Sequence, residues 1–133
     1  MIIDPGKSAE YLLAHRCLQY GHMVCWPSSQ HVPYDVLVDN TRTIYKVQVK
    51  ACRSKAKGND TYSVRLKKGV SGEKYQDGDF DLLAAYVYET HTWYIIPYSV
   101  VRGKTGITLY PHRLTEQVGQ YENFKEAWHL LKE

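Results

Sequence analysis

The strongest restriction on the fold comes from the alternating residues at the end of the segment from Pro33 to Lys50. From Tyr45 onward, apolar residues alternate strictly with polar ones, and the polar positions include Gln48 and Lys50. A period of two residues predicts a half-buried β-strand. Gln48 and Lys50 then share one face of that strand, about 6.6 Å apart. Both side chains can therefore reach the same ion or the same phosphate.

A second strand is expected immediately upstream, from Tyr34 to Val38. This run is apolar and β-branched apart from Asp35 near its start, a pattern typical of a strand buried on both faces. The intervening residues 39–42 read Asp-Asn-Thr-Arg. Asp and Asn favour turns because their side chains bond their own backbone and tolerate left-handed geometry. The predicted hairpin brings Asp35 beside the face that carries Gln48 and Lys50.

Two interpretations of this hairpin are open from the residues alone. An alternating strand with Lys-Gln-Lys facing outward is most often a solvated sheet face. Asp35 argues against that interpretation, because a carboxylate in an apolar strand is costly unless it is paired, hydrogen-bonded or bound to a metal. The hairpin is thus either an ordinary surface or a site built on an acid, an amide and a lysine.

An N-terminal helix is expected to begin at Asp4-Pro5, a capping acid followed by a proline that needs no backbone donor. Apolar residues follow at helical spacing, and Gly21 ends the pattern where a left-handed cap is expected. Glu10 lies beside the apolar stripe, so its carboxylate can point toward a neighbouring sheet. The alternative is a surface glutamate paired with Lys7.

The order of these residues resembles the PD-(D/E)XK nuclease superfamily: a glutamate in the first helix, an aspartate opening a strand, and Gln-Val-Lys closing the next. Its QVK form is similar to the group I intron-associated homing endonucleases and the small Holliday junction resolvases. The run over residues 80–97 is similar to the strand pair that follows the core in the intron-associated group, so the resemblance covers most of the chain. The chain departs from the pattern at Tyr34, which separates Pro33 from Asp35, and at Gln48, where many members carry an acid.

The resemblance implies one α/β domain over residues 1–133, a restriction-endonuclease-like mixed sheet of about five strands flanked by an N-terminal and a C-terminal helix. A length of 133 residues suits one domain. The implied activity is Mg²⁺-dependent hydrolysis of DNA phosphodiesters, with Mn²⁺ as a substitute. The implied catalytic residues are Glu10, Asp35, Gln48 and Lys50. One or two ions would be held by Asp35, Glu10, the Gln48 side-chain oxygen and the Val49 carbonyl. Alternatives are a junction-resolving nuclease and a non-catalytic DNA-binding or assembly module on a nuclease scaffold.

Positive charge is concentrated next to this predicted site. The segment from Lys50 to Lys68 carries seven basic residues and one acid, although the whole chain has a net charge of only +3. We expect a basic hairpin with a strand over 62–66, whose side chains neutralise DNA phosphates. The expected contacts are Arg53, Lys55, Lys57, Arg65, Lys67 and Lys68. The alternative is a solvated loop. A break in both strands needs two sites, so a homodimer or a dimer of dimers is expected.

Further strands are expected at 22–26, 82–88, 92–96 and 107–110, with a C-terminal helix over 122–132 that packs across the sheet. The three cysteines lack metal-ligand spacing and leave one unpaired, which favours a reducing, intracellular (cytoplasmic) compartment. The sequence shows no signal peptide and no apolar run of transmembrane length, so no membrane association is expected.

Overall fold

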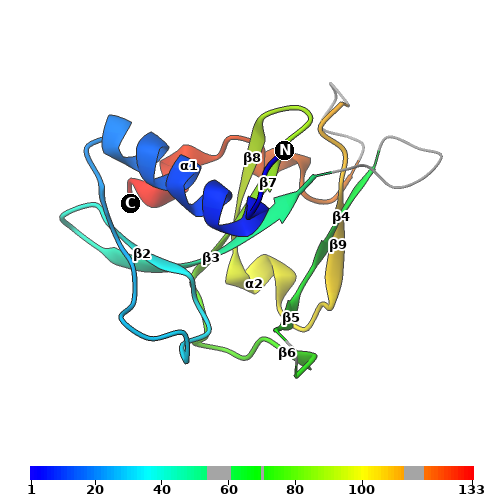
Figure 1. The fold of residues 1–133 in the computed structure, drawn as a ribbon, viewed down its shortest axis with the longest axis horizontal. Coiled ribbons are helices and arrows are strands. Elements are labelled where there is room, and N and C mark those ends of the chain that lie inside the picture. Colours follow the sequence, from blue (N-terminus) through cyan, green and yellow to red (C-terminus); the bar gives the residue numbers. More distant parts are fainter. Residues whose placement is uncertain (54–60, 70, 113–118) are drawn as a thin grey trace.

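The computed structural model describes residues 1–53, 61–69, 71–112 and 119–133. Its centre is a five-stranded sheet of order β1-β2-β3-β7-β8 (Figure 1). The strands are β1 (Met23–Cys25), β2 (Val36–Asp39), β3 (Ile44–Cys52), β7 (Leu82–Val87) and β8 (Thr92–Pro97). β3 and β7 are parallel, and the other neighbours are antiparallel. The expected mixed sheet of about five strands is confirmed.

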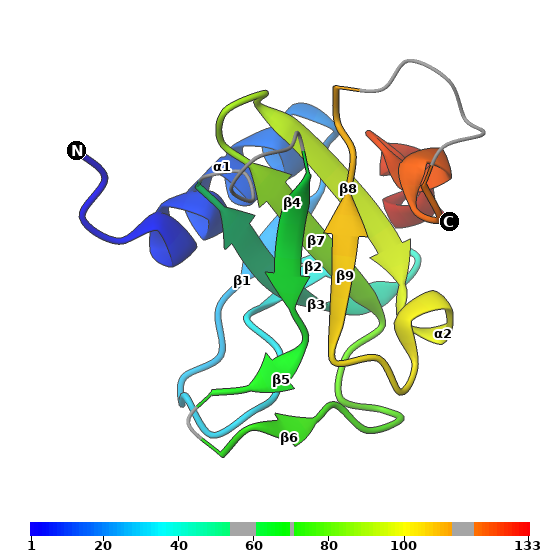
Figure 2. The ribbon, with the colours of Figure 1, turned by 90° about the vertical axis from the view of Figure 1, so that its right-hand side faces the viewer.

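Both faces of the central sheet are covered, which explains why β7 is apolar at every position. Ala84 belongs to the core shared with helix α1 (Pro5–Gln19), whereas Ala85 belongs to a second core on the opposite face. That second core lies under a two-stranded sheet of β4 (Tyr62–Arg65) and β9 (Gly106–Leu109). Figure 2 shows the layers, with α1 behind the central sheet and the β4–β9 pair in front.

Helix α1 forms as its capping residues predict. The Asp4 carboxylate accepts a hydrogen bond from the Lys7 backbone N–H at 2.9 Å, and Pro5 occupies the first turn. The chain leaves the helix through Gly21, whose φ of +81° a side chain would strain. Ala9, Leu13, Ala14 and Cys17 form the buried face of the helix. Within the described ranges, no helix combines the length and hydropathy that a bilayer span requires.

The basic segment after β3 folds differently from a simple hairpin. Its strand β4 pairs with the distant β9 in antiparallel fashion. A short hairpin follows, made of β5 (Lys67–Lys68) and β6 (Glu73–Lys74), and the brief helix α2 (Tyr98–Val101) comes after β8. Residues 54–60, which the expected hairpin would include, lie outside the described residues.

The predicted C-terminal helix over 122–132 is wrong. The structure has two short 3-10 helices there, η1 (Glu122–Phe124) and η2 (Trp128–Leu131). Between them the backbone bonds the edge strand β8: Lys125 bridges Tyr94, and the Glu126 N–H donates to the Trp93 carbonyl at 2.8 Å. Glu126 also has a φ of +52°, which breaks any continuous helix. Bonds to a sheet edge have replaced the helical bonds that the apolar spacing suggested.

Candidate active site

The predicted hairpin forms, and it fixes Asp35 against β3. The Asp35 backbone N–H donates to the Val47 carbonyl at 2.9 Å, directly before the first residue pair of β2 and β3. Its side-chain Oδ2 accepts two hydrogen bonds, from Gln48 Nε2 at 2.9 Å and from the Val49 N–H at 2.8 Å. The acid and the amide that the sequence singled out are therefore in direct contact.

The surroundings of Asp35 make its negative charge unfavourable without a cation. Burial raises the pKa of Asp35 above its usual value, and the charge of Glu10 raises it further. The Val49 N–H, Lys50 and Lys7 act in the opposite direction but do not cancel the shift. No described residue donates a hydrogen bond to the Asp35 Oδ1 atom, so that oxygen remains available for a ligand.

Glu10 is paired with Lys7 and also lies at the candidate site, so both interpretations of its sequence position hold. Its Oε1 accepts hydrogen bonds from Lys7 Nζ at 3.0 Å and from Trp26 Nε1 at 2.8 Å. The side chain also lines a cavity of about 860 Å³ together with Asp35, Gln48 and Val49. The Trp26 contact could not be predicted from local patterns, because it joins residues from the helix and from the loop after β1.

Lys50 lies two residues beyond Gln48 on the same face of β3 and is half-buried. Burial lowers the pKa of Lys50, nearby Arg65 lowers it further, and Asp35 raises it. No described carboxylate is within ion-pair distance of its ammonium. Instead, Nζ lies 5.7 Å from the centre of the Tyr75 ring.

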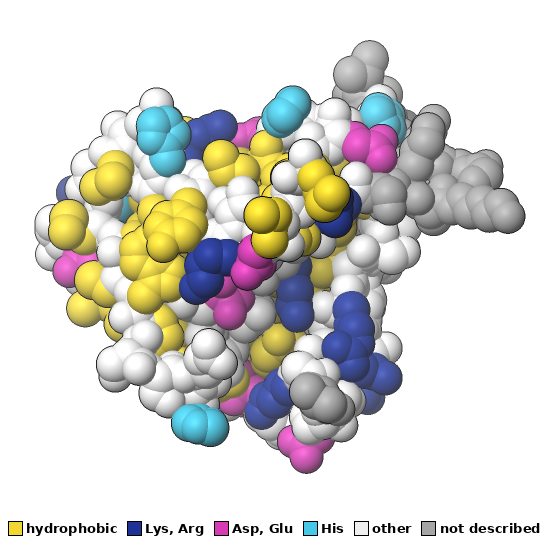
Figure 3. Space-filling model, viewed as in Figure 1, with side chains coloured by type: hydrophobic (Ala, Val, Ile, Leu, Met, Phe, Trp, Pro, Cys, Tyr) yellow, Lys and Arg dark blue, Asp and Glu magenta, His cyan; other side chains and the backbone are white. Residues whose placement is uncertain are grey.

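Three described residues of the predicted DNA-binding set lie at one end of the molecule. Arg65 ends β4, and Lys67 and Lys68 form β5, in the region where Figure 3 shows Lys and Arg side chains gathered at the lower right. Lys68 pairs with Asp79 at 2.9 Å, and both line a second cavity of about 520 Å³ that Asp35 and Gln48 also line. Arg53 is exposed just after β3, whereas Lys55 and Lys57 lie outside the described residues.

The donor atoms around the first cavity suit a hard cation. Among the described residues, no three His, Cys, Asp or Glu side chains gather as a metal-binding group. Three acidic residues do line the cavity, Asp4, Glu10 and Asp35, and Gln48 and Val49 line it with them. Carboxylate, amide and backbone oxygens are the ligands that Mg²⁺ takes, usually with several waters. The residues present therefore fit an oxygen-ligated divalent cation with an incomplete protein shell.

The antiparallel β2–β3 hairpin and the parallel β3–β7 pair form a mixed sheet of the restriction-endonuclease-like fold. The chain belongs to the PD-(D/E)XK endonuclease family, whose model matches residues 4–131. It is 33% identical to Protein 5.3 of Escherichia phage T7 over 103 residues, which span 77% of this chain and 85% of that protein.

Two solved structures share the fold. The bacterial homing endonuclease I-Ssp6803I superposes with a TM-score of 0.81 at 26% identity, covering 96% of this chain and 90% of that one. Hjc, a Holliday junction resolvase from Archaeoglobus fulgidus, gives a TM-score of 0.53 at 16% identity, covering 85% and 93%. The second likeness concerns the fold alone. The resemblance noted from the sequence is confirmed.

Proposed function

We propose that this protein is a divalent-metal-dependent DNA endonuclease of the homing-endonuclease-like kind. The observation that carries the proposal is the direct contact of Asp35 with Gln48 and Val49 beside a cavity that Glu10 also lines. The likeness to I-Ssp6803I over 96% of the chain supports the homing-like kind over a junction-resolving one.

In this proposal Asp35 and Glu10, with the Gln48 side-chain oxygen and the Val49 carbonyl, hold one or two Mg²⁺ ions, and Mn²⁺ can substitute. Such an ion, when bound, polarises the scissile phosphate and lowers the pKa of the attacking water. Asp35 supplies a carboxylate that the β2–β3 hairpin holds rigidly, because Oδ2 is already bonded twice. Glu10 is held in a similar way through its Oε1 atom.

Lys50 supplies positive charge next to the reacting phosphate. Among the described residues, no carboxylate lies within ion-pair distance of its ammonium, which leaves the ammonium available to a phosphate. Negative charge on the phosphate oxygens increases in the transition state, and a fixed cation stabilises that charge most effectively in a partly buried site.

A cleavage assay on supercoiled, linear and four-way-junction DNA, with and without Mg²⁺, tests the proposal. We expect Asp35→Ala and Lys50→Ala each to abolish cleavage while circular dichroism shows a folded protein. Asp39→Ala is the matched control, because this aspartate lies at the other end of β2 and bonds only the local turn. Full activity of either site variant, or of the wild type in excess EDTA, contradicts the metal-dependent mechanism. If the protein binds DNA but cleaves it with no divalent metal tested, the alternative of a non-catalytic DNA-binding module is favoured.

We also infer that the enzyme works as a homodimer or a dimer of dimers, since one site per chain cuts one strand. Light scattering of the protein on DNA should give a mass of two or four chains, and a strict monomer contradicts this part of the proposal. Competition between a four-way junction and random duplex separates the two targets, because a junction resolvase prefers branched DNA of any sequence.

A further inference from the structure

The ammonium of Lys50 lies over an aromatic ring, whereas a partly buried lysine is more commonly paired with a carboxylate. Lys50 Nζ lies 5.7 Å from the centre of the Tyr75 ring. Cations within about 6 Å of a ring centre are attracted to its negative face. A carboxylate at this position would hold the ammonium more strongly but would also cancel its charge. The ring attracts the ammonium and leaves its charge intact.

The Tyr75 ring is itself held in place by two other aromatic residues. Tyr75 and Phe80 meet edge to face, with ring centres 5.1 Å apart and planes at 82°. Phe80 meets Tyr98 in the same way, at 5.1 Å and 87°. The Tyr98 hydroxyl also donates to the Tyr75 carbonyl at 3.3 Å. Edge-to-face contact is a favoured geometry, and Phe80 is only 2% exposed, so this trio is anchored in the core.

Tyr75 also borders the site. It lines the cavity of about 520 Å³ that Asp35 and Gln48 also line. It follows directly after β6, so the ring joins the basic β5–β6 hairpin to the strand that carries Lys50. The residue is half-buried, and burial together with the charges of Asp35 and Asp79 raises the pKa of Tyr75 to about 12. The hydroxyl therefore stays neutral at ordinary pH and leaves the ring as the group that meets the ammonium.

We propose that Tyr75 is a positioning residue, whose ring holds the Lys50 ammonium beside the cavity that Tyr75, Asp35 and Gln48 line. The proposal rests on the proposed nuclease function. A lysine side chain has four rotatable bonds. If the ring restricts them before the reaction, less conformational entropy is lost when the transition state forms. The ring thereby raises the rate of the chemical step and makes no contact with DNA that would change affinity.

Cleavage kinetics test the consequence of this contact. We expect Tyr75→Leu to lower kcat by about three- to thirty-fold, the range of a cation–π contact, with an unchanged KM for DNA. Tyr75→Phe keeps the ring and should cleave at nearly the wild-type rate. Tyr20→Leu is the matched control, because the Tyr20 ring lies 4.4 Å from Lys132 Nζ and contributes to neither cavity. A wild-type kcat in Tyr75→Leu overturns the proposal.

Fluorinated phenylalanines at position 75 separate attraction from packing. Successive fluorines weaken the negative face of the ring while its shape changes little, so log kcat should fall stepwise from Phe to its trifluoro analogue. This series also replaces Tyr75→Leu if that variant does not fold. A kcat that is independent of fluorination shows that the ring acts by packing alone and overturns the proposal.

Nuclear magnetic resonance reads the contact without any cleavage. A ring below the ammonium should shift the terminal methylene protons of Lys50 upfield, and this shift should persist in Tyr75→Phe and vanish in Tyr75→Leu. If the chemical shifts of these Lys50 protons are the same in the wild type and in both variants, the proposal is wrong. A wild-type protein that cleaves no DNA with any divalent metal overturns the nuclease function instead, and the upfield shift still decides whether Tyr75 holds Lys50.

Discussion

At the scale of single residues, the contact between Gln48 and Asp35 sets the charge of the candidate site. The Gln48 amide donates a hydrogen bond to the Asp35 Oδ2 atom at 2.9 Å. An acidic side chain in place of Gln48 would instead repel the Asp35 carboxylate. Gln48 is only 8% exposed, so the contact is shielded from water. A neutral residue at this position allows the hairpin to close without a metal, but it leaves a bound metal with less negative charge.

Gln48→Glu should therefore lower the thermal stability of the metal-free protein and raise its affinity for the metal. Two carboxylates at hydrogen-bonding distance repel each other, and a cation relieves that repulsion. We expect a melting temperature lower by about 5 °C in EDTA and a Mg²⁺ affinity higher by about tenfold, measured by calorimetry. Gln19→Glu, on the exposed end of α1, is the control. An unchanged affinity means that Gln48 is not a ligand.

Trp26 is, with Lys7, one of two residues that bond the Glu10 carboxylate, and removing its N–H should loosen that carboxylate. Trp26→Phe keeps a ring beside Tyr11, whose centre lies 5.4 Å from that of the indole, but removes the 2.8 Å hydrogen bond. Loss of such an outer partner should lower Mg²⁺ affinity by about tenfold. In a Glu10→Gln background the same change should have little further effect, which a double-mutant cycle checks. Equal losses in both backgrounds would show that Trp26 acts independently of Glu10.

His22 should make the stability of the fold depend on pH. The side chain is 7% exposed, its Nδ1 has no hydrogen-bond partner among the described residues, and burial and Lys132 lower the pKa of His22. Below about pH 6.5 the unfolded chain therefore binds a proton that the folded chain resists, so stability falls as the pH decreases.

Urea unfolding at pH 8 and pH 5 measures this effect against His22→Gln, which cannot titrate. The stability of the wild type relative to His22→Gln should decrease from pH 8 to pH 5. A constant difference would show that His22 takes up its proton equally in both states.

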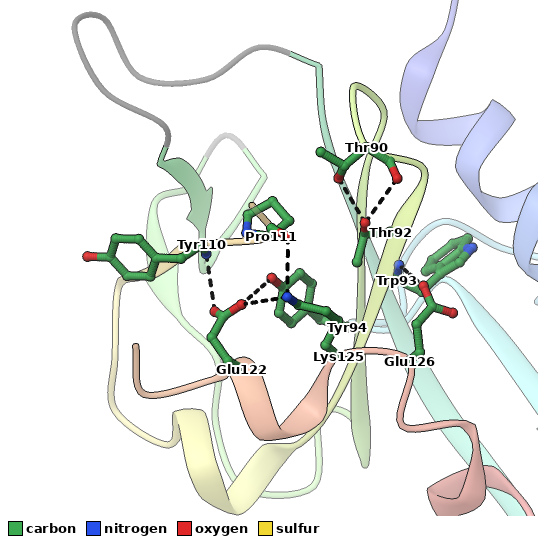
Figure 4. Close-up of polar contacts among 9 residues, drawn as sticks. All are labelled: Thr90, Thr92, Trp93, Tyr94, Tyr110, Pro111, Glu122, Lys125 and Glu126. Atoms are coloured by element: carbon green, nitrogen blue, oxygen red, sulfur yellow. Dashed lines mark hydrogen bonds and ion pairs between the residues drawn. The ribbon is translucent and has the colours of Figure 1, made fainter. Parts of the chain in front are cut away.

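At the scale of elements, one glutamate attaches the C-terminal segment to the sheet. Glu126 Oε2 accepts from the Trp93 backbone N–H at 2.8 Å, and Oε1 accepts from Trp128 Nε1 at 2.8 Å and from Arg16 at 3.2 Å. A few residues away, buried Glu122 accepts from the Tyr94 hydroxyl at 2.6 Å (Figure 4). Side-chain bonds to β8 thus replace the regular bonding of a helix.

Glu126→Ala should lower the free energy of unfolding by about 1–3 kcal/mol, because the Trp93 N–H and the Trp128 indole lose their acceptor. Chemical denaturation measures the change. Glu133→Ala is the control, since that side chain is exposed at the end of the chain. A loss no larger than that of the control would show that the apolar contacts of Trp128 and Leu131 hold the segment without Glu126.

At the scale of the whole molecule, charge is distributed unevenly, with basic side chains gathered around β4, β5 and β6 (Figure 3). If these residues contact phosphates, each one releases counterions when DNA binds. Lys67→Ala should lower the slope of log affinity against log salt concentration by about 1. Arg42→Ala, in the turn at the far end of β2, should leave the slope unchanged. Equal slopes for both variants and the wild type would place the DNA elsewhere.

Sequence patterns alone predicted the β2–β3 hairpin and the first helix, and they proposed Glu10, Asp35, Gln48 and Lys50 as the site. These depend on local properties: strand periodicity, turn and capping chemistry, and the cost of a carboxylate in an apolar run. Three features emerged only from the packed fold: the pairing of β4 with β9, the bridge from the C-terminal segment to β8, and the contacts of Trp26 and Tyr75. Each of these joins segments far apart in the chain, where a backbone group or side chain takes whichever partner the packed sheet presents, and no local pattern encodes that choice.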